Sequence, residues 1–87
     1  MDANVSKQTT LARMSSGQTG IVFQIAGGYG LGRRLQALGI RPGKRITKVS
    51  AMFGHGPVTV QVDNTQIALG FGMAGKIIVE VDKSNTR

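Results

Sequence analysis

Apolar residues recur at every second position in four segments of this chain, and this alternation restricts the fold more than any other feature. It is clean over residues 58–62, and it is also present over residues 20–25, 65–69 and 77–81. A period of two is typical of strands that bury one face. Residues 44–52 are rich in β-branched side chains but alternate imperfectly, which indicates a bulge or a strong bend. The sequence therefore predicts five short strands.

The first predicted strand is half-buried and is ended by a pair of glycines. Its alternation places Ile21, Phe23 and Ile25 on one face, with Val22 and Gln24 on the other. A strand of this kind packs one face on a core and leaves the other face at the surface.

One stretch, residues 29–38, instead spaces its three leucines at helical intervals. Gly39 is expected to end this helix in the left-handed conformation, and Ile40 to fold back onto Leu35 as a Schellman motif requires. The Pro-Gly pair at residues 42–43 cannot continue the helix and suits a tight turn. The chain therefore has one short helix, placed after its first predicted strand.

These elements fit one small domain, because 87 residues leave room for no more. Strands joined by hairpins pair in the antiparallel sense, and five short twisted strands hide their edges best by curling into a small barrel. We predict a mainly β fold of this kind over residues 11–81. Residues 1–10 are expected to form a flexible N-terminal arm, and residues 82–87 a C-terminal tail.

Eleven Lys and Arg face four Asp and Glu, which gives a net charge of +7. Such a charge favours an anionic partner, which could be an acidic protein face, an anionic membrane surface or nucleic acid. Six basic residues, the last of them Lys48, fall between positions 33 and 48, where a solvated basic face is the alternative to a contact surface. The residues expected to contact a partner are Tyr29, Arg33, Arg34, Arg41, Lys44 and Arg45.

The composition argues against catalysis. The chain has no cysteine, which excludes disulfides, thiolate zinc sites and thiol nucleophiles. His55 is the single histidine and is only a weak metal candidate, because metal sites need three or four ligands. No nucleophile can be paired with a base, so we expect a protein that is not an enzyme and has no cofactor. A cytoplasmic location is expected, since no signal-peptide pattern or cysteine is present.

Two glycine-rich segments partly match nucleotide-binding motifs. Residues 70–76 match the P-loop spacing up to Lys76, but the next residue is Ile77 rather than Ser or Thr, and it opens a strand. Residues 27–32 lack the third glycine of a dinucleotide fingerprint. We therefore expect no small-molecule substrate, and a glycine turn at 70–75 in which Phe71 or Met73 closes one end of the barrel.

The pattern over residues 11–81 resembles the FeoA family. The specific part is the block Arg-Leu-x-x-Leu-Gly-Ile-x-Pro-Gly at residues 34–43. The resemblance implies an SH3-like five-stranded antiparallel barrel with a short α-helix inserted after the first strand. Further matches are Leu-x-x-Met-x-x-Gly-x-x-Gly at 11–20, Ile-Ala-Leu at 67–69, Met-Ala at 73–74 and Ile-Val-Glu at 78–80.

The same resemblance implies a function. The family is thought to assist FeoB, the bacterial membrane transporter of ferrous iron, which has a cytoplasmic GTPase domain. A cytoplasmic accessory that docks there and supports iron uptake, at or near the inner membrane surface, is therefore the expected role. The chain departs from the usual pattern at residues 70–72 and in its glycine-rich helix entry. Binding of a transition metal is implied at family level only.

Two alternatives remain open. A basic small barrel can bind nucleic acid or act as a regulatory domain, but only Tyr29 and Phe53 are plausible for stacking on bases, so no nucleic acid is expected. A similar barrel also forms the C-terminal domain of iron-dependent repressors. No helix-turn-helix pattern precedes Leu11, so a free-standing protein is the expectation.

Overall fold

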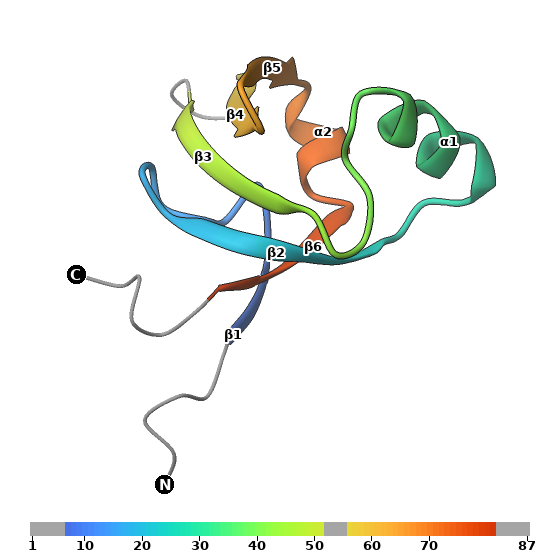
Figure 1. The fold of residues 1–87 in the computed structure, drawn as a ribbon, viewed down its shortest axis with the longest axis horizontal. Helices are drawn as coiled ribbons and strands as arrows, with labels where there is room; N and C mark the ends of the chain where they lie inside the picture. Colours follow the sequence, from blue (N-terminus) through green and yellow to red (C-terminus); the bar gives the residue numbers. More distant parts are fainter. Residues whose placement is uncertain (1–6, 52–55, 82–87) are drawn as a thin grey trace, which may run out of the picture.

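The computed structural model describes residues 7–51 and 56–81, except for the side chain of residue 51. These residues form six strands and two short helices, arranged along the chain as Figure 1 shows. In order they are β1 (Lys7–Thr10), β2 (Thr19–Ile25), α1 (Tyr29–Ala37), β3 (Arg45–Ala51), β4 (Val58–Val62), β5 (Thr65–Leu69), α2 (Phe71–Ala74) and β6 (Ile77–Val81).

The strands form one antiparallel sheet in the order β1-β6-β2-β3-β4-β5. The sheet curls around the core, with α1 set apart at one end (Figure 1). The prediction of a mainly β antiparallel fold with a short α-helix after the first predicted strand is confirmed. Because β1 precedes that predicted strand, the helix follows the second strand of the structure, β2. Among the described residues, the strand order does not join β1 to β5, so the curled sheet is not closed by a continuous hydrogen-bonded ladder.

The predicted arm is wrong for its last four residues. Lys7–Thr10 is an edge strand, β1, whose register runs from Lys7 opposite Val81 to Thr10 opposite Ile78. This strand pairs through its backbone and leaves Lys7 exposed, so it needs no apolar alternation and gives no such signal in the sequence. The fold therefore has six strands where five were expected. Residues 1–6 and 82–87 lie outside the described part.

The predicted division of β2 into two faces is wrong because the strand contains a bulge. The register against β6 shifts between Val22 and Gln24, so the alternation slips by one residue. Val22 is buried, Phe23 is 47% exposed, and Ile25 packs at the margin of the core. The bulge therefore turns an aromatic side chain toward the surface. The bulge expected in the next strand is confirmed, in β3 between Lys48 and Ser50.

The end of α1 matches the prediction closely. Gly39 has a φ of 90°, and its N–H donates to the Gln36 carbonyl at 2.9 Å. The N–H of Ile40 donates to the Leu35 carbonyl at 2.9 Å, which completes a Schellman motif. A turn follows at residues 41–44, closed by a 3.0 Å bond from the Lys44 N–H to the Arg41 carbonyl. Two bonds of 2.8 Å, from the Gly43 N–H to the Val22 carbonyl and from the Val22 N–H to the Lys44 carbonyl, hold this turn against β2.

The core is made of aliphatic side chains from every layer of the fold. Leu35 and Ile40 enter it from α1 and its cap, and Leu11 and Met14 from the turn before β2. Met73 packs against it from α2, whereas Phe71 is half-buried. The core strands contribute alternate residues, as expected: Val58, Val60 and Val62 from β4, and Ile77, Val79 and Val81 from β6.

Candidate partner-binding groove

A groove of about 360 Å³ lies between α1 and β2. Its lining is largely apolar, and no acidic side chain contributes to it. Three parts of the chain meet there, which are one face of the helix, the bulged end of the strand and the turn after the helix. They contribute Tyr29, Gly32, Arg33 and Gln36 from α1, Phe23, Gln24 and Ile25 from β2, and Arg41 and Pro42 from the turn.

Local structure explains why these residues converge. Tyr29, Arg33 and Gln36 are three or four positions apart, so they share one face of α1. This face lies beside the one that Leu35 packs into the core. The bulge in β2 directs Phe23 to the opposite wall. The groove therefore depends on the bulge and the helix cap together.

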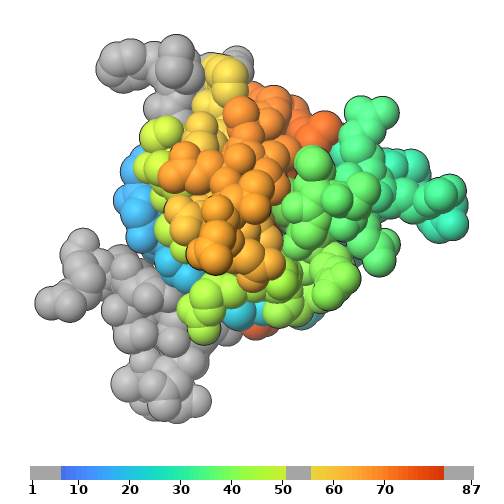
Figure 2. All heavy atoms as spheres, turned by 45° about the horizontal axis from the view of Figure 1, so that its top comes forward, coloured from blue at the N-terminus to red at the C-terminus, as the bar shows by residue number. Residues whose placement is uncertain are grey.

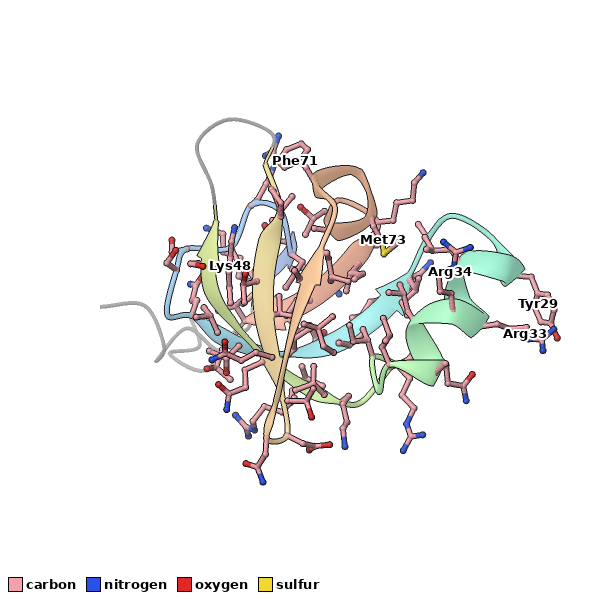
Figure 3. The ribbon with its side chains drawn as sticks, turned by 90° about the horizontal axis from the view of Figure 1, so that it is seen from above. Tyr29, Arg33, Arg34, Lys48, Phe71 and Met73 are labelled. Carbon is pink, nitrogen blue, oxygen red and sulfur yellow. The ribbon has the colours of Figure 1, made fainter. Side chains whose placement is uncertain are left out.

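Large apolar side chains are unusually exposed around the groove. Tyr29 is 79% exposed and Phe23 is 47% exposed. The Arg33 guanidinium carbon lies 5.5 Å from the centre of the Tyr29 ring, a cation–π contact between residues one helical turn apart. Both side chains project from the far end of α1 (Figure 3). An aromatic ring with a paired arginine is a surface suited to recognition.

The six residues expected to contact a partner do not form one surface. Tyr29, Arg33 and Arg41 line the groove. Arg34 is exposed on another side of α1, toward Met73 (Figure 3). The chain therefore brings half of the expected residues together.

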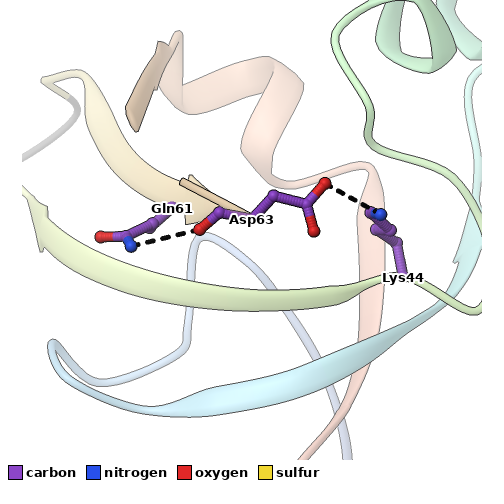
Figure 4. A network of polar contacts seen from close by, with 3 residues as sticks. All are labelled: Lys44, Gln61 and Asp63. Atoms are coloured by element: carbon purple, nitrogen blue, oxygen red, sulfur yellow. Dashed lines mark hydrogen bonds and ion pairs between the residues drawn. The ribbon is translucent and has the colours of Figure 1, made fainter. Parts of the chain in front are cut away.

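Lys44 and Arg45 belong to a different region, at the β4–β5 hairpin. The Lys44 Nζ atom lies 2.9 Å from Asp63 Oδ2, in an ion pair (Figure 4). Gln61 Nε2 donates to the Asp63 carbonyl at 3.3 Å in the same network. Arg45 lines a smaller depression of about 150 Å³ with Thr47, Gln61 and Asp63. Asp63 is eighteen or more positions away in sequence, so the local charge pattern could not reveal this pairing.

Lys48 was grouped with the basic contact stretch, and this was wrong. It is 3% exposed, and its Nζ donates to the Met14 carbonyl at 2.6 Å and to the Ala12 carbonyl at 3.0 Å. Burial lowers the pKa of this amine. The signal was present in the sequence, because Lys48 stands two positions after the buried Ile46 and so shares its inward face.

The groove also contains residues that sequence reasoning missed. Phe23 gave no signal, since the bulge that exposes it was not predicted. Gln36 could have been found from its spacing to Arg33 on the helix. Pro42 was interpreted as structural only, although it lines the groove.

The structure offers no metal centre in its described part. Across residues 7–51 and 56–81, no three His, Cys, Asp or Glu side chains come together. The weak candidate His55 lies outside the described residues. Residues 70–76 contain α2 and lead into β6, as the rejection of a P-loop required. Within the described part of the chain, neither α1 nor α2 is long and apolar enough to cross a bilayer.

A curled antiparallel sheet with a short helix inserted after β2 defines a small SH3-like domain. The FeoA domain model matches residues 9–81. Fe(2+) transport protein A of Methanocaldococcus jannaschii is 36% identical over 70 residues, which covers 80% of this chain and 83% of that protein. The chain therefore belongs to the FeoA family.

Solved structures agree with this assignment. The crystal structure of an iron uptake regulatory protein, FeoA, has a TM-score of 0.79 and 32% identity, and covers 86% of this chain and 97% of that one. FeoA of Stenotrophomonas maltophilia, solved with zinc and described as an SH3 domain protein, has a TM-score of 0.71 and 27% identity, and covers 82% and 88%. The expected SH3-like fold is confirmed by these neighbours.

Proposed function

We propose that this protein is a non-catalytic accessory of ferrous iron uptake that docks on the cytoplasmic GTPase domain of a FeoB-type transporter. Membership of a family whose archaeal relative is named for Fe(2+) transport supports a role in this process. The observation that favours docking is the groove, where Phe23 and Tyr29 are exposed beside Arg33 and Arg41. Aromatic and arginine side chains are the residues enriched at binding hot spots.

The size of this surface suits a reversible complex. Fully burying a large apolar side chain contributes about 1.5–3 kcal/mol. Phe23 already buries about half of its surface and Tyr29 about a fifth, so covering both adds roughly 2–4 kcal/mol. Association costs at least about 4 kcal/mol, so contacts beyond these two rings are needed. The groove is therefore one anchor of a larger, transient interface.

Charge would bring the partners together. The net charge of +7 attracts the protein to an acidic domain face and to the anionic cytoplasmic leaflet beside it. Arg34, exposed on another side of α1, would add to this attraction outside the groove. The proposed location is the cytoplasm, at the inner face of the membrane.

An NMR titration tests this proposal. The ¹⁵N-labelled protein is mixed with the FeoB cytoplasmic domain, with and without guanine nucleotide. We expect the amide signals of β2 and α1 and of Arg41 to shift, while those of β5 do not. Absence of shifts in every nucleotide state, with normal iron uptake in a deletion strain, would refute docking. Salt-sensitive binding of single-stranded DNA by the same residues would favour the nucleic-acid alternative instead.

A further inference from the structure

We infer that the groove between α1 and β2 is a site for a short acidic peptide segment. An extended chain would seat one apolar side chain between Phe23 and Tyr29, above Gly32, and place carboxylates on Arg33 and Arg41. This inference rests on the proposed function in one respect, namely that the segment belongs to the docking partner. It adds the chemistry that the partner presents.

The shape of the groove limits what can enter it. Its volume of about 360 Å³ accommodates a few side chains, not the surface of a globular domain. Gly32 leaves its floor open, since a Cβ atom built there meets nothing within 4 Å. The helix α1 projects from the body of the molecule, in green in Figure 2, so this wall of the groove lies at the surface.

The charges select an acidic segment. The described carboxylates are Asp63, which pairs with Lys44, and Glu80, which accepts a 3.4 Å hydrogen bond from Gln8. Among the described residues, neither carboxylate forms an ion pair with Arg33 or Arg41, and neither lines the groove. An arginine beside an apolar wall presents a planar fork that a carboxylate can accept in two bonds. The groove is therefore complementary to a peptide that combines acidic and apolar residues.

The arrangement of apolar residues favours a peptide over a membrane surface. A bilayer needs its anchoring residues on one outer face. Leu38, the third large exposed apolar residue, is nine positions after Tyr29, which places it about half a turn around the helix axis. Phe23 and Tyr29 face a concavity that Leu38 does not line. The two amides of Gln24 and Gln36 also line it, and they suit the polar backbone of a peptide.

Two helix glycines provide a matched test. Gly32 lines the groove, whereas Gly30 does not, and both have open space where a Cβ would lie. Neither has a positive φ, so a side chain is tolerated at both. Gly32→Met fills the groove, and Gly30→Met makes the same change to the helix elsewhere. Because methionine favours helix over glycine, both variants should keep or raise the melting temperature.

The probe is a fluorescein-labelled peptide of alternating glutamate and leucine, titrated with the full chain and followed by fluorescence anisotropy. We expect Gly32→Met to weaken binding by about tenfold or more, as removal of a contact worth about 1.4 kcal/mol would do. Gly30→Met should bind as the unaltered protein does. Arg33→Gln with Arg41→Gln should weaken binding and flatten its salt dependence. Peptides with lysine for glutamate, or serine for leucine, should bind more weakly.

Several results would overturn the inference. Equal loss in Gly30→Met and Gly32→Met would show that the groove is not the site. Equal affinity of the glutamate and lysine peptides would remove the acidic preference. If vesicles of phosphatidylglycerol and phosphatidylcholine bind the unaltered protein but not Gly32→Met, and the peptide does not bind, the surface would be assigned to lipid.

The same experiments distinguish failure of the groove inference from failure of the proposed function. If the FeoB domain binds the unaltered protein and both methionine variants equally, the groove inference is wrong and docking stands. If the peptide binds in the groove but the FeoB domain does not bind at all, the groove inference stands and the transporter is the wrong partner.

Discussion

Basic residues of the stretch between residues 33 and 48 lie in opposite environments. Arg33 and Arg41 lie at the surface, where they flank an apolar groove. Lys48, on β3, is buried and donates to two backbone carbonyls of the turn before β2. Net charge alone does not distinguish the three. Whether a basic residue serves recognition or stability thus depends on the face of the element that it occupies.

The buried and the exposed cations differ in their desolvation cost and in their contribution to the stability of the fold. The Lys48 ammonium loses most of its hydration, and two carbonyls replace part of it. It joins the turn of residues 11–14 to β3, which lie more than thirty positions apart. The Arg33 guanidinium is exposed to solvent and lies 5.5 Å from the centre of the exposed Tyr29 ring. The first arrangement stabilises the fold, and the second leaves charge available to a partner.

The largest expected effect is the loss of the buried lysine. Lys48→Met keeps most of the side-chain length but removes both hydrogen bonds and leaves two carbonyls unpaired. We expect the free energy of unfolding to fall by about 2–3 kcal/mol, because a hydrogen bond to a charged group contributes about 1.5–3 kcal/mol. The cost of burying the ammonium offsets part of what the two bonds contribute together. Urea denaturation measures this change.

Arg41→Met is the matched control at an exposed position of the same stretch. It should change the free energy of unfolding by less than about 0.5 kcal/mol, as is usual for a surface substitution. If Lys48→Met is as stable as the unaltered protein, or if Arg41→Met is destabilised as much as Lys48→Met, the contrast between the buried and the exposed cations is wrong.

A smaller effect is expected for the ion pair of Lys44 and Asp63, which lies between these extremes. Their side chains are 29% and 69% exposed, so solvent screens the pair. A double-mutant cycle of Lys44→Met and Asp63→Asn should give a coupling of about 0.5 kcal/mol that declines in high salt. Asparagine is chosen because Asp63 has a φ of 57°, which asparagine tolerates. A coupling energy that salt does not change would show that the pair is shielded from solvent, as Lys48 is.

The smallest effect concerns pH. Burial lowers the pKa of Lys48 below its ordinary value of 10.5, so above neutral pH the unfolded state holds this proton more tightly than the folded state. The resulting cost is fully present below the lowered pKa and is relieved as pH rises toward 10.5. Relative to Lys48→Met, the unaltered protein should therefore gain stability with rising alkaline pH. Parallel pH profiles of the two proteins would show that the amine is not desolvated.

Much of the fold could be predicted because its signals are local. Alternation located the strands of the core, and the sequence Leu-Gly-Ile-x-Pro-Gly after Leu35 indicated the helix cap that the structure shows. β1 escaped prediction because an edge strand with exposed side chains pairs by its backbone alone. The bulge in β2 escaped because it arises from the register against β6, a partner more than fifty positions later.

The candidate site was predictable only in part. Tyr29 and Arg33 share a helix face by their spacing, so the sequence could group them. The groove also includes Phe23 and Arg41 but not Arg34 or Arg45. This selection follows from how β2, α1 and the turn after the helix pack together. No local pattern encodes that meeting.

The sequence by itself determined the family, the mainly β antiparallel fold, the short capped helix and the excess of positive charge, because periodicity, turn chemistry and composition act over a few residues. The tertiary structure decided which charges are available. It buried Lys48 beneath the turn of residues 11–14, paired Lys44 with Asp63, and left Arg33 and Arg41 beside an apolar groove. Burial and ion pairing depend on which distant segments pack together, and only the folded chain specifies that.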